Sequence, residues 1–92
     1  MHAVVVRVTI SDREAAQQGL DQDVVPQVSQ SPGFQAGYWT WKGDTGLSMI
    51  LFDSEEAAIQ AANRVRDMVG GMSGAVTLED VELREVVAHA RG

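Results

Sequence analysis

Residues 32–57 read PGFQAGYWTWKGDTGLSMILFDSEEA, and this stretch decides the fold. Its initial Pro-Gly pair predicts the end of a helix, because proline cannot continue a helix and glycine tolerates the turn that follows. The aromatic residues over 34–42 predict a strand, and the Gly-Asp-Thr-Gly cluster at 43–46 predicts a tight turn into a second strand over 47–52. Asp53 then opens an acid-rich helix start. The stretch therefore predicts a helix end, an antiparallel hairpin and a second helix.

The segment before the hairpin predicts a strand followed by an interrupted helix. Residues 3–10 alternate, and the apolar side chains of one face are Val4, Val6, Val8 and Ile10. Ser11, followed three residues later by Glu14, fits a capping box that starts a helix. Pro26 removes one backbone donor from that helix at a cost of about 3 kcal/mol, so we expect the helix to be kinked or interrupted around Val25-Pro26.

The segment after the hairpin predicts a second helix and the end of the sheet. Residues 54–69 carry an apolar stripe at helical spacing, and the glycine-rich run at 70–74 ends this helix. Alternating apolar residues then predict a short strand over 75–78 and a longer one over 81–88. The order β-α-β-β-α-β is the split βαβ pattern. We therefore predict an α+β fold, a ferredoxin-like split βαβ sandwich with an antiparallel sheet and both helices on one face.

Composition and charge exclude several classes of function. The chain has 92 residues and no cysteine, which excludes disulfides, thiol catalysis and thiolate metal sites. Its net charge is −6, and its few Lys and Arg residues are scattered, which disfavours nucleic acids and anionic membranes as partners. No apolar stretch approaches the roughly 20 residues that span a bilayer. We expect a cytoplasmic protein.

Two short motifs carry a resemblance to a known family. Pro32-Gly33-Phe34 stands at the joint between helix and strand, and residues 52–57, Phe-Asp-Ser-Glu-Glu-Ala, stand at the joint between strand and helix. In this arrangement the chain resembles the antibiotic-biosynthesis-monooxygenase-like (ABM-like) domains of the dimeric α/β-barrel superfamily. The resemblance implies a single ABM-like domain over 1–92 that pairs with a second copy as a dimeric α/β barrel. Members include cofactor-free oxygenases of aromatic compounds, haem-degrading enzymes and proteins of unassigned activity.

Departures from the family narrow the expected chemistry. Haem-degrading members use a histidine on the second helix and an asparagine in the first strand, and this sequence has neither in 54–69 or 3–10. Phe52 stands where the family commonly has tryptophan. The two histidines, His2 and His89, lie near the two ends of the chain, and we expect both to be solvated rather than metal ligands. We therefore expect no cofactor and no metal.

The aromatic strand supplies the candidate site residues. Strict alternation divides it into one face with Phe34, Ala36, Tyr38 and Thr40 and another with Gln35, Gly37, Trp39 and Trp41. We predict that Tyr38 faces the helices and, with Phe52, contacts a ligand. We predict that Trp39 and Trp41, together with Arg7, lie on the bare face of the sheet at a homodimer interface, since a large exposed apolar patch usually marks one.

Two functions remain open on these residues. The first is a small homodimeric α/β-barrel protein of unassigned activity that binds a small apolar or aromatic ligand. The alternative is a cofactor-independent monooxygenase acting on an electron-rich aromatic substrate. A ligand site is expected between the helices and the sheet, unless the gap is filled completely by Leu20, Val24, Val65 and Val69.

Overall fold

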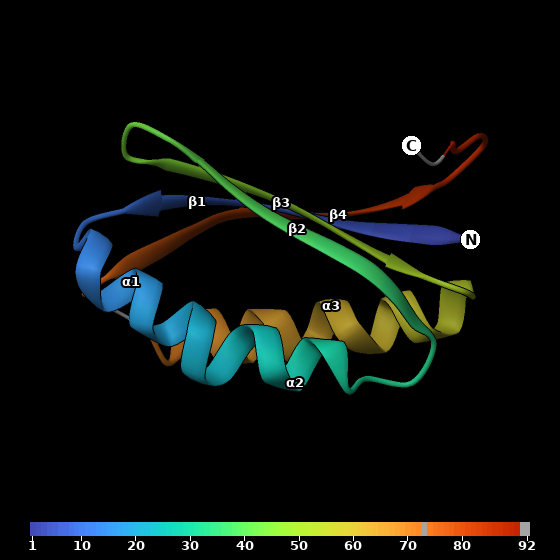
Figure 1. The fold of residues 1–92 in the computed structure, drawn as a ribbon, viewed down its shortest axis with the longest axis horizontal. Coiled ribbons are helices and arrows are strands. Elements are labelled where there is room, and N and C mark those ends of the chain that lie inside the picture. The colour runs from blue at the N-terminus through green and yellow to red at the C-terminus, as the bar shows by residue number, and fades with distance from the viewer. Residues whose placement is uncertain (73, 91–92) are drawn as a thin grey trace.

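The computed structural model describes residues 1–72 and 74–90 of the chain. The elements follow the predicted order, and the helices cover one face of a four-stranded sheet (Figure 1). They are β1 (His2–Ile10), α1 (Arg13–Gly19), the π-helical turn η1 (Leu20–Val24), α2 (Val25–Ser29), β2 (Phe34–Lys42), β3 (Thr45–Phe52), α3 (Glu55–Gly70) and β4 (Val76–Glu85). The prediction of an α+β, ferredoxin-like sandwich is confirmed.

The sheet has the strand order β2-β3-β1-β4, and every neighbouring pair is antiparallel. The first and last strands of the chain are therefore neighbours, and β2 and β4 form the two edges. Helix α3 contacts β4, β1 and β3, whereas α2 contacts the edge strand β2. The two helical segments, α1 to α2 and α3, thus lie side by side in one layer beneath different halves of the sheet, as Figure 1 shows.

The first helical stretch begins one residue later than predicted. Asp12, and not Ser11, is the N-cap, and its carboxylate accepts a hydrogen bond from the Ala15 amide at 3.1 Å. The predicted interruption is confirmed, and it takes the form of η1, which ends directly before Val25. The Val25 amide donates to the Leu20 carbonyl five residues back, and α2 then starts with proline among its first residues, where no intrahelical donor is needed.

Helix α3 and strand β4 complete the fold. The Ser54 hydroxyl caps α3 by accepting from the Ala57 amide at 3.2 Å, and Gly71 follows the last helical residue. The prediction of two final strands is wrong, because a single strand runs from Val76 to Glu85. An irregularity in its pairing with β1 accommodates one extra residue in place of the predicted break.

The core lies between the sheet and the helices. Its largest fully buried side chains are Phe52, Ile50, Val4 and Val28, and the helices add a row of alanines and valines from α1 to α3. Among the described residues, no helix combines the length and the apolar character that crossing a membrane requires.

Candidate ligand-binding site

Strand β2 turns its two tryptophans toward the helices. The register of β2 against β3 shifts between Phe34 and Ala36, so Gln35 is an extra residue in the strand, a β-bulge. Because side chains alternate along a strand, one extra residue moves all that follow it to the opposite face. Trp39 and Trp41 are therefore half-buried and pack against the core.

The bulge overturns the predicted faces of this strand. Tyr38, which was expected beneath the helices, lies on the outer face in register with Met49 and is 64% exposed. Trp39 and Trp41, which were expected on the outer face, lie on the helix side. Alternation counted from Phe34 is wrong here, since it takes no account of the bulge.

Two glycines give the indole rings room to lie against the sheet. A Cβ atom at Gly37 would stand 2.7 Å from Cη2 of Trp39, and one at Gly46 would stand 3.3 Å from Cδ1 of Trp41. The same atom at Gly46 would lie 2.6 Å from Cγ2 of Val8. The rings thus occupy space that any other residue at these two positions would need for its own side chain.

A cavity of about 50 Å³ lies between the rings and the helices. All four strands and the helical elements α1, η1 and α3 contribute to its walls, together with Met72 after α3: Val6, Val8, Ile10, Ala16, Leu20, Val24, Trp39, Trp41, Ser48, Ile50, Val65, Val69, Met72 and Val76. The four side chains that were expected to fill the gap, Leu20, Val24, Val65 and Val69, line this cavity and leave part of it empty. The expected place for a site, between helices and sheet, therefore holds a cavity.

The cavity is chemically simple. Among the described residues that line it, none carries an ionisable side chain, so they offer it neither a general base nor a charged metal ligand. Its polar lining residues are Ser48, which is only 9% exposed and carries a hydroxyl, and Trp39 and Trp41, which each carry one indole N–H. Ser48 lies in register with Trp39 on one side and with Val6 on the other. The cavity therefore suits an apolar body with at most a few hydrogen-bonding groups.

An arginine lies beside one of the two rings. The Arg13 guanidinium lies 5.0 Å from the centre of the Trp41 ring, and its Nη1 donates to the Gly43 carbonyl at 2.8 Å. These contacts join α1 to the turn between β2 and β3 and place a positive charge against the Trp41 ring.

Phe52, the second predicted ligand contact, has a different position. It is fully buried and packs edge-on against Phe34, with ring centres 6.2 Å apart. It does not line the cavity and serves the core at the other end of the sheet. Its predicted contact with a ligand is not supported by this geometry.

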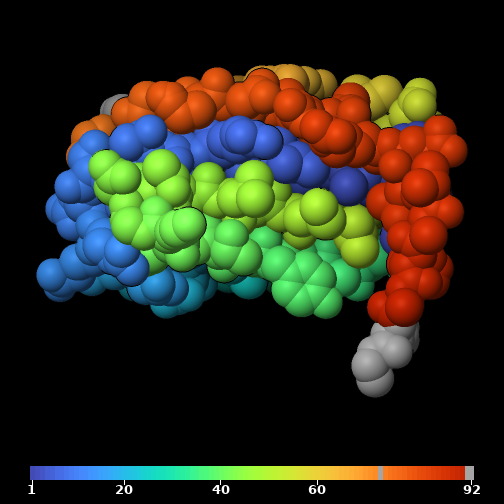
Figure 2. Space-filling view, turned by 90° about the horizontal axis from the view of Figure 1, so that it is seen from above, coloured from blue at the N-terminus to red at the C-terminus, as the bar shows by residue number. Residues whose placement is uncertain are grey.

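The outer face of the sheet carries no helix, as Figure 2 shows by the side-by-side strands that fill the view. An apolar patch of three exposed side chains occupies β2 and β3: Tyr38, Leu47 (47% exposed) and Met49 (46% exposed). Val5 of β1 lies in register with Met49 but is only 6% exposed, so it is not part of this exposed patch. We call Tyr38, Leu47 and Met49 the outer patch.

Charged residues border the outer patch on the side of β4. Arg7 is exposed, as predicted, and lies in register with Leu47 and with Asp80. Arg84 contacts Glu82 through Nε at 2.8 Å, and this hydrogen bond and the charge of Arg84 lower the pKa of that carboxyl below its usual value. A smaller effect of Arg7 acts in the same direction. The predicted interface role of Arg7 stays a prediction.

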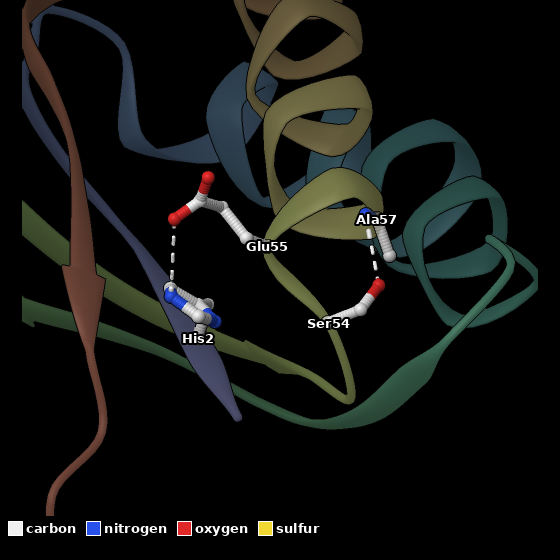
Figure 3. A network of polar contacts seen from close by, with 4 residues as sticks. All are labelled: His2, Ser54, Glu55 and Ala57. Atoms are coloured by element: carbon white, nitrogen blue, oxygen red, sulfur yellow. Dashed lines mark hydrogen bonds and ion pairs between the residues drawn. The ribbon is translucent and has the colours of Figure 1, made fainter.

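The two histidines have different surroundings. His2 is half-buried, and its Nε2 lies 3.4 Å from Oε2 of Glu55 at the start of α3, beside the Ser54 cap (Figure 3). His89 is exposed and lies beyond the end of β4. The expectation that both are solvated is wrong for His2. Among residues 1–72 and 74–90, no three His, Asp or Glu side chains form a group that could hold a metal ion.

The sequence pattern did not identify several of the cavity residues as site residues. Ser48 was a polar position within an apolar strand, Leu20 belonged to the helical stripe, and Met72 stood in the glycine-rich run. A serine on the buried face of a central strand is a signal that alternation from Ile50 could have found. Met72 carries no such signal, because it lies outside the regular elements.

No family model matches the sequence, and a search of curated proteins finds no match. Among solved structures, SnoaB, a cofactor-independent oxygenase from Streptomyces nogalater, superposes with a TM-score of 0.77 at 13% identity, covering 96% of this chain and 94% of SnoaB. MupZ from Pseudomonas fluorescens gives 0.70 at 11% identity over 89% of this chain, which spans 65% of MupZ. A dimeric ferredoxin-like protein from an uncultured marine organism gives 0.65 at 10% identity, with both chains fully covered.

A putative antibiotic biosynthesis monooxygenase from Chloroflexus aurantiacus superposes with a TM-score of 0.66 at 15% identity, covering 99% of this chain and 98% of that chain. The chain shares its fold with these structures. The resemblance carried by residues 32–34 and 52–57 is thus confirmed at the level of the fold. Identities near one residue in ten extend the likeness no further than the arrangement of helices and strands.

Proposed function

We propose that the protein is a homodimeric α/β-barrel protein that binds a small, flat, apolar or aromatic ligand within each protomer. The observation that carries this proposal is the cavity between helices and sheet, which is lined by Trp39, Trp41 and Ser48. Aromatic faces favour stacking with another ring, and one buried hydroxyl can orient a polar substituent. Without an occupant, a gap of this kind would be a cost to the core.

The size of the cavity sets a condition on binding. At about 50 Å³ it has room for about four water molecules, whereas an engineered cavity of about 150 Å³ is needed to hold benzene. An aromatic ligand therefore requires a movement of the walls. The side chains best placed to move are those of the edge strand β2, because they have packing partners on fewer sides than the residues of the central strands.

Thermal unfolding with 2-naphthol tests the proposal. We expect 2-naphthol to raise the melting temperature in a saturable way, because a ligand that binds only the folded state stabilises it. Ser48→Ala should weaken binding by about fivefold to tenfold, the size of one hydrogen bond. The matched control is Tyr38→Phe, which removes a hydroxyl from the outer face and should leave binding unchanged. Absence of stabilisation by 2-naphthol and by related flat aromatics would contradict the proposal.

Cofactor-independent oxygenation of an electron-rich aromatic is the second candidate. It is favoured by the likeness to SnoaB, which is a cofactor-independent oxygenase. It is compatible with a cavity that lacks ionisable groups, since the electron richness of such a substrate supplies much of the driving force. The test is oxygen uptake with a panel of dihydroxynaphthalenes. Uptake that depends on the protein and falls with Ser48→Ala would support it, and rates equal to the protein-free blank would contradict it.

Homodimer formation belongs to the same proposal. The outer patch gives β2 and β3 an exposed apolar surface that a single helical layer cannot cover. Arg7 at its border lies among the carboxylates Asp80 and Glu82, so one sheet offers both signs of charge to a second copy. The likeness to a dimeric ferredoxin-like protein supports this arrangement.

A further inference from the structure

Three side chains line both the cavity and a hollow on the outside of the molecule: Leu20, Trp39 and Trp41. The outer hollow has a volume of about 340 Å³ and lies between η1 and β2, with Gln17, Asp21 and Val25 as its other lining residues. Because these three side chains have the cavity on one side and solvent on the other, they form its partition. Their displacement would join the two spaces.

A second hollow lies on the other side of η1. It has a volume of about 210 Å³, and it shares Val24 and Met72 with the cavity. The side chains that separate this hollow from the cavity lie where η1 packs against α3, and Val24 among them is buried in the core. The partition beside β2 contains two half-buried rings of an edge strand instead. It is therefore the easier of the two to open.

The segment that carries Leu20 is itself irregular. In η1 the Val25 amide bonds to the Leu20 carbonyl with the wide spacing of a π-helix, a geometry that is rare and that recurs at functional sites. Gly19 precedes this turn, and the Met72 methyl group stands only 2.5 Å from where a Cβ of residue 19 would lie. A change of hydrogen bonding within η1 would shift Leu20 while α1 and α2 keep their own turns.

We propose that the gap between η1 and β2 is the ligand entrance, that Leu20, Trp39 and Trp41 are its movable partition, and that Asp21 makes it selective for neutral or cationic aromatics over carboxylates. This inference rests on the proposed function, because it names the route into the same cavity and the class of ligand that the route admits.

Charge at the entrance carries the selectivity. Asp21 and Gln17 stand at the mouth, joined by a hydrogen bond of 3.1 Å from Nε2 of Gln17 to Oδ1 of Asp21. The hollow on the other side of η1 is also acidic, with Asp23 and Asp67. Neither of these two hollows is lined by Lys or Arg among the described residues, so an anionic ligand meets a carboxylate on both routes. The Arg13 guanidinium lies over the Trp41 ring and donates to the Gly43 carbonyl, so it is already engaged in contacts of its own. A neutral ring is not repelled.

The route is tested by the kinetics of 2-naphthol binding, followed by stopped-flow tryptophan fluorescence. Leu20→Ala and Met72→Ala form a matched pair, since each shortens one large side chain that lines the cavity, on opposite sides of η1. We expect Leu20→Ala to raise the association and dissociation rates together by about tenfold, with a much smaller change in Kd. Met72→Ala also enlarges the cavity, and it should raise the association rate by a smaller factor than Leu20→Ala does.

The selectivity is tested with 2-naphthol and 2-naphthoate, which share a ring system and differ in charge. Asp21→Asn should raise the association rate of 2-naphthoate by about tenfold and leave that of 2-naphthol unchanged. Asp67→Asn, at the other hollow, is the control and should change neither rate. Asp21 is exposed, so this variant keeps the test available if Leu20→Ala fails to fold.

The outcomes separate this inference from the proposed function. If wild type binds no 2-naphthol, the proposed function fails and the entrance fails with it. If wild type binds but Met72→Ala accelerates binding and Leu20→Ala does not, or Asp67→Asn and not Asp21→Asn admits 2-naphthoate, the entrance is overturned while the proposed function stands.

Discussion

Gln35 determines which side chains of β2 face the cavity. As the extra residue of the bulge, it sets the alternation of the rest of the strand, so that Trp39 and Trp41 reach the helix side and Tyr38 does not. Gly37 then leaves room for the Trp39 ring to lie along the strand. The chemistry of the site thus depends on two residues that carry no functional group at the cavity.

Gly37→Ala tests this dependence at the scale of a residue. The added methyl group would stand 2.7 Å from Trp39, so the ring must move, and we expect a loss of about 1–3 kcal/mol in the free energy of unfolding. Chemical denaturation measures that loss, and a shifted tryptophan emission would accompany it. Gly70→Ala is the control, because nothing lies within 4 Å of a Cβ there and alanine favours a helix. Equal stability of the two variants would contradict the packing described.

The site residues were only partly predictable, for a physical reason. The position of a cavity between helices and sheet follows from the layer arrangement, and the aromatic richness of 34–42 pointed to its wall. The choice of Tyr38 over the tryptophans failed because alternation cannot reveal a bulge, whose extra residue is fixed by the pairing of two strands. Phe52 failed as a ligand contact because its place at the end of β3 lies beyond the cavity.

At the scale of elements, the start of α1 is the clearest case for a measurement. Asp12→Ala removes the carboxylate that accepts from the Ala15 amide and should lower stability by about 1 kcal/mol. Ser11→Ala should leave stability nearly unchanged, since the described contact of Ser11 is the bond from its amide to the Ala75 carbonyl, which the variant keeps. Thermal or chemical unfolding of the two variants compares them, and a larger loss for Ser11→Ala would restore the capping box with Glu14.

The interruption of the first helix was predictable, and its form was not. Pro26 forces a break because it lacks an amide hydrogen and clashes with the preceding turn. Such a break can take the form of a bend, a loop or a π turn. The form depends on what the neighbouring side chains pack against, which here is the cavity and Met72. The local sequence therefore indicates the position of the break, whereas tertiary packing determines its form.

At the scale of the whole molecule, the bare face of the sheet carries the expectation of a dimer. We expect sedimentation at micromolar concentration to give about twice the 9.9 kDa of one chain. Met49→Glu should shift this to the monomer, because a carboxylate at the centre of the outer patch would be buried without a partner. Ile59→Glu is the control, since Ile59 is 42% exposed on α3, away from the sheet. A wild-type monomer would contradict the dimer.

The overall architecture was the most predictable property of the chain. Element order, sheet type and the one-sided helical layer follow from periodicity and turn signals, which report local structure directly. Extension of the fold to a single domain over 1–92 stays a prediction, as does the interface role of Arg7. Both properties depend on packing contacts, within the molecule or with a partner, and the periodicity of one sequence carries no information on such contacts.

The most direct test of the central claim uses the only two tryptophans of the chain, both of which line the cavity. Their indole N–H signals in a ¹⁵N correlation spectrum report on the cavity and on its partition toward the outer hollow. Titration with 2-naphthol should shift both signals in a saturable way, while the backbone amides of the outer patch, Tyr38, Leu47 and Met49, stay in place. Shifts confined to those amides, with both indole signals unmoved at saturation, would contradict a ligand site between helices and sheet.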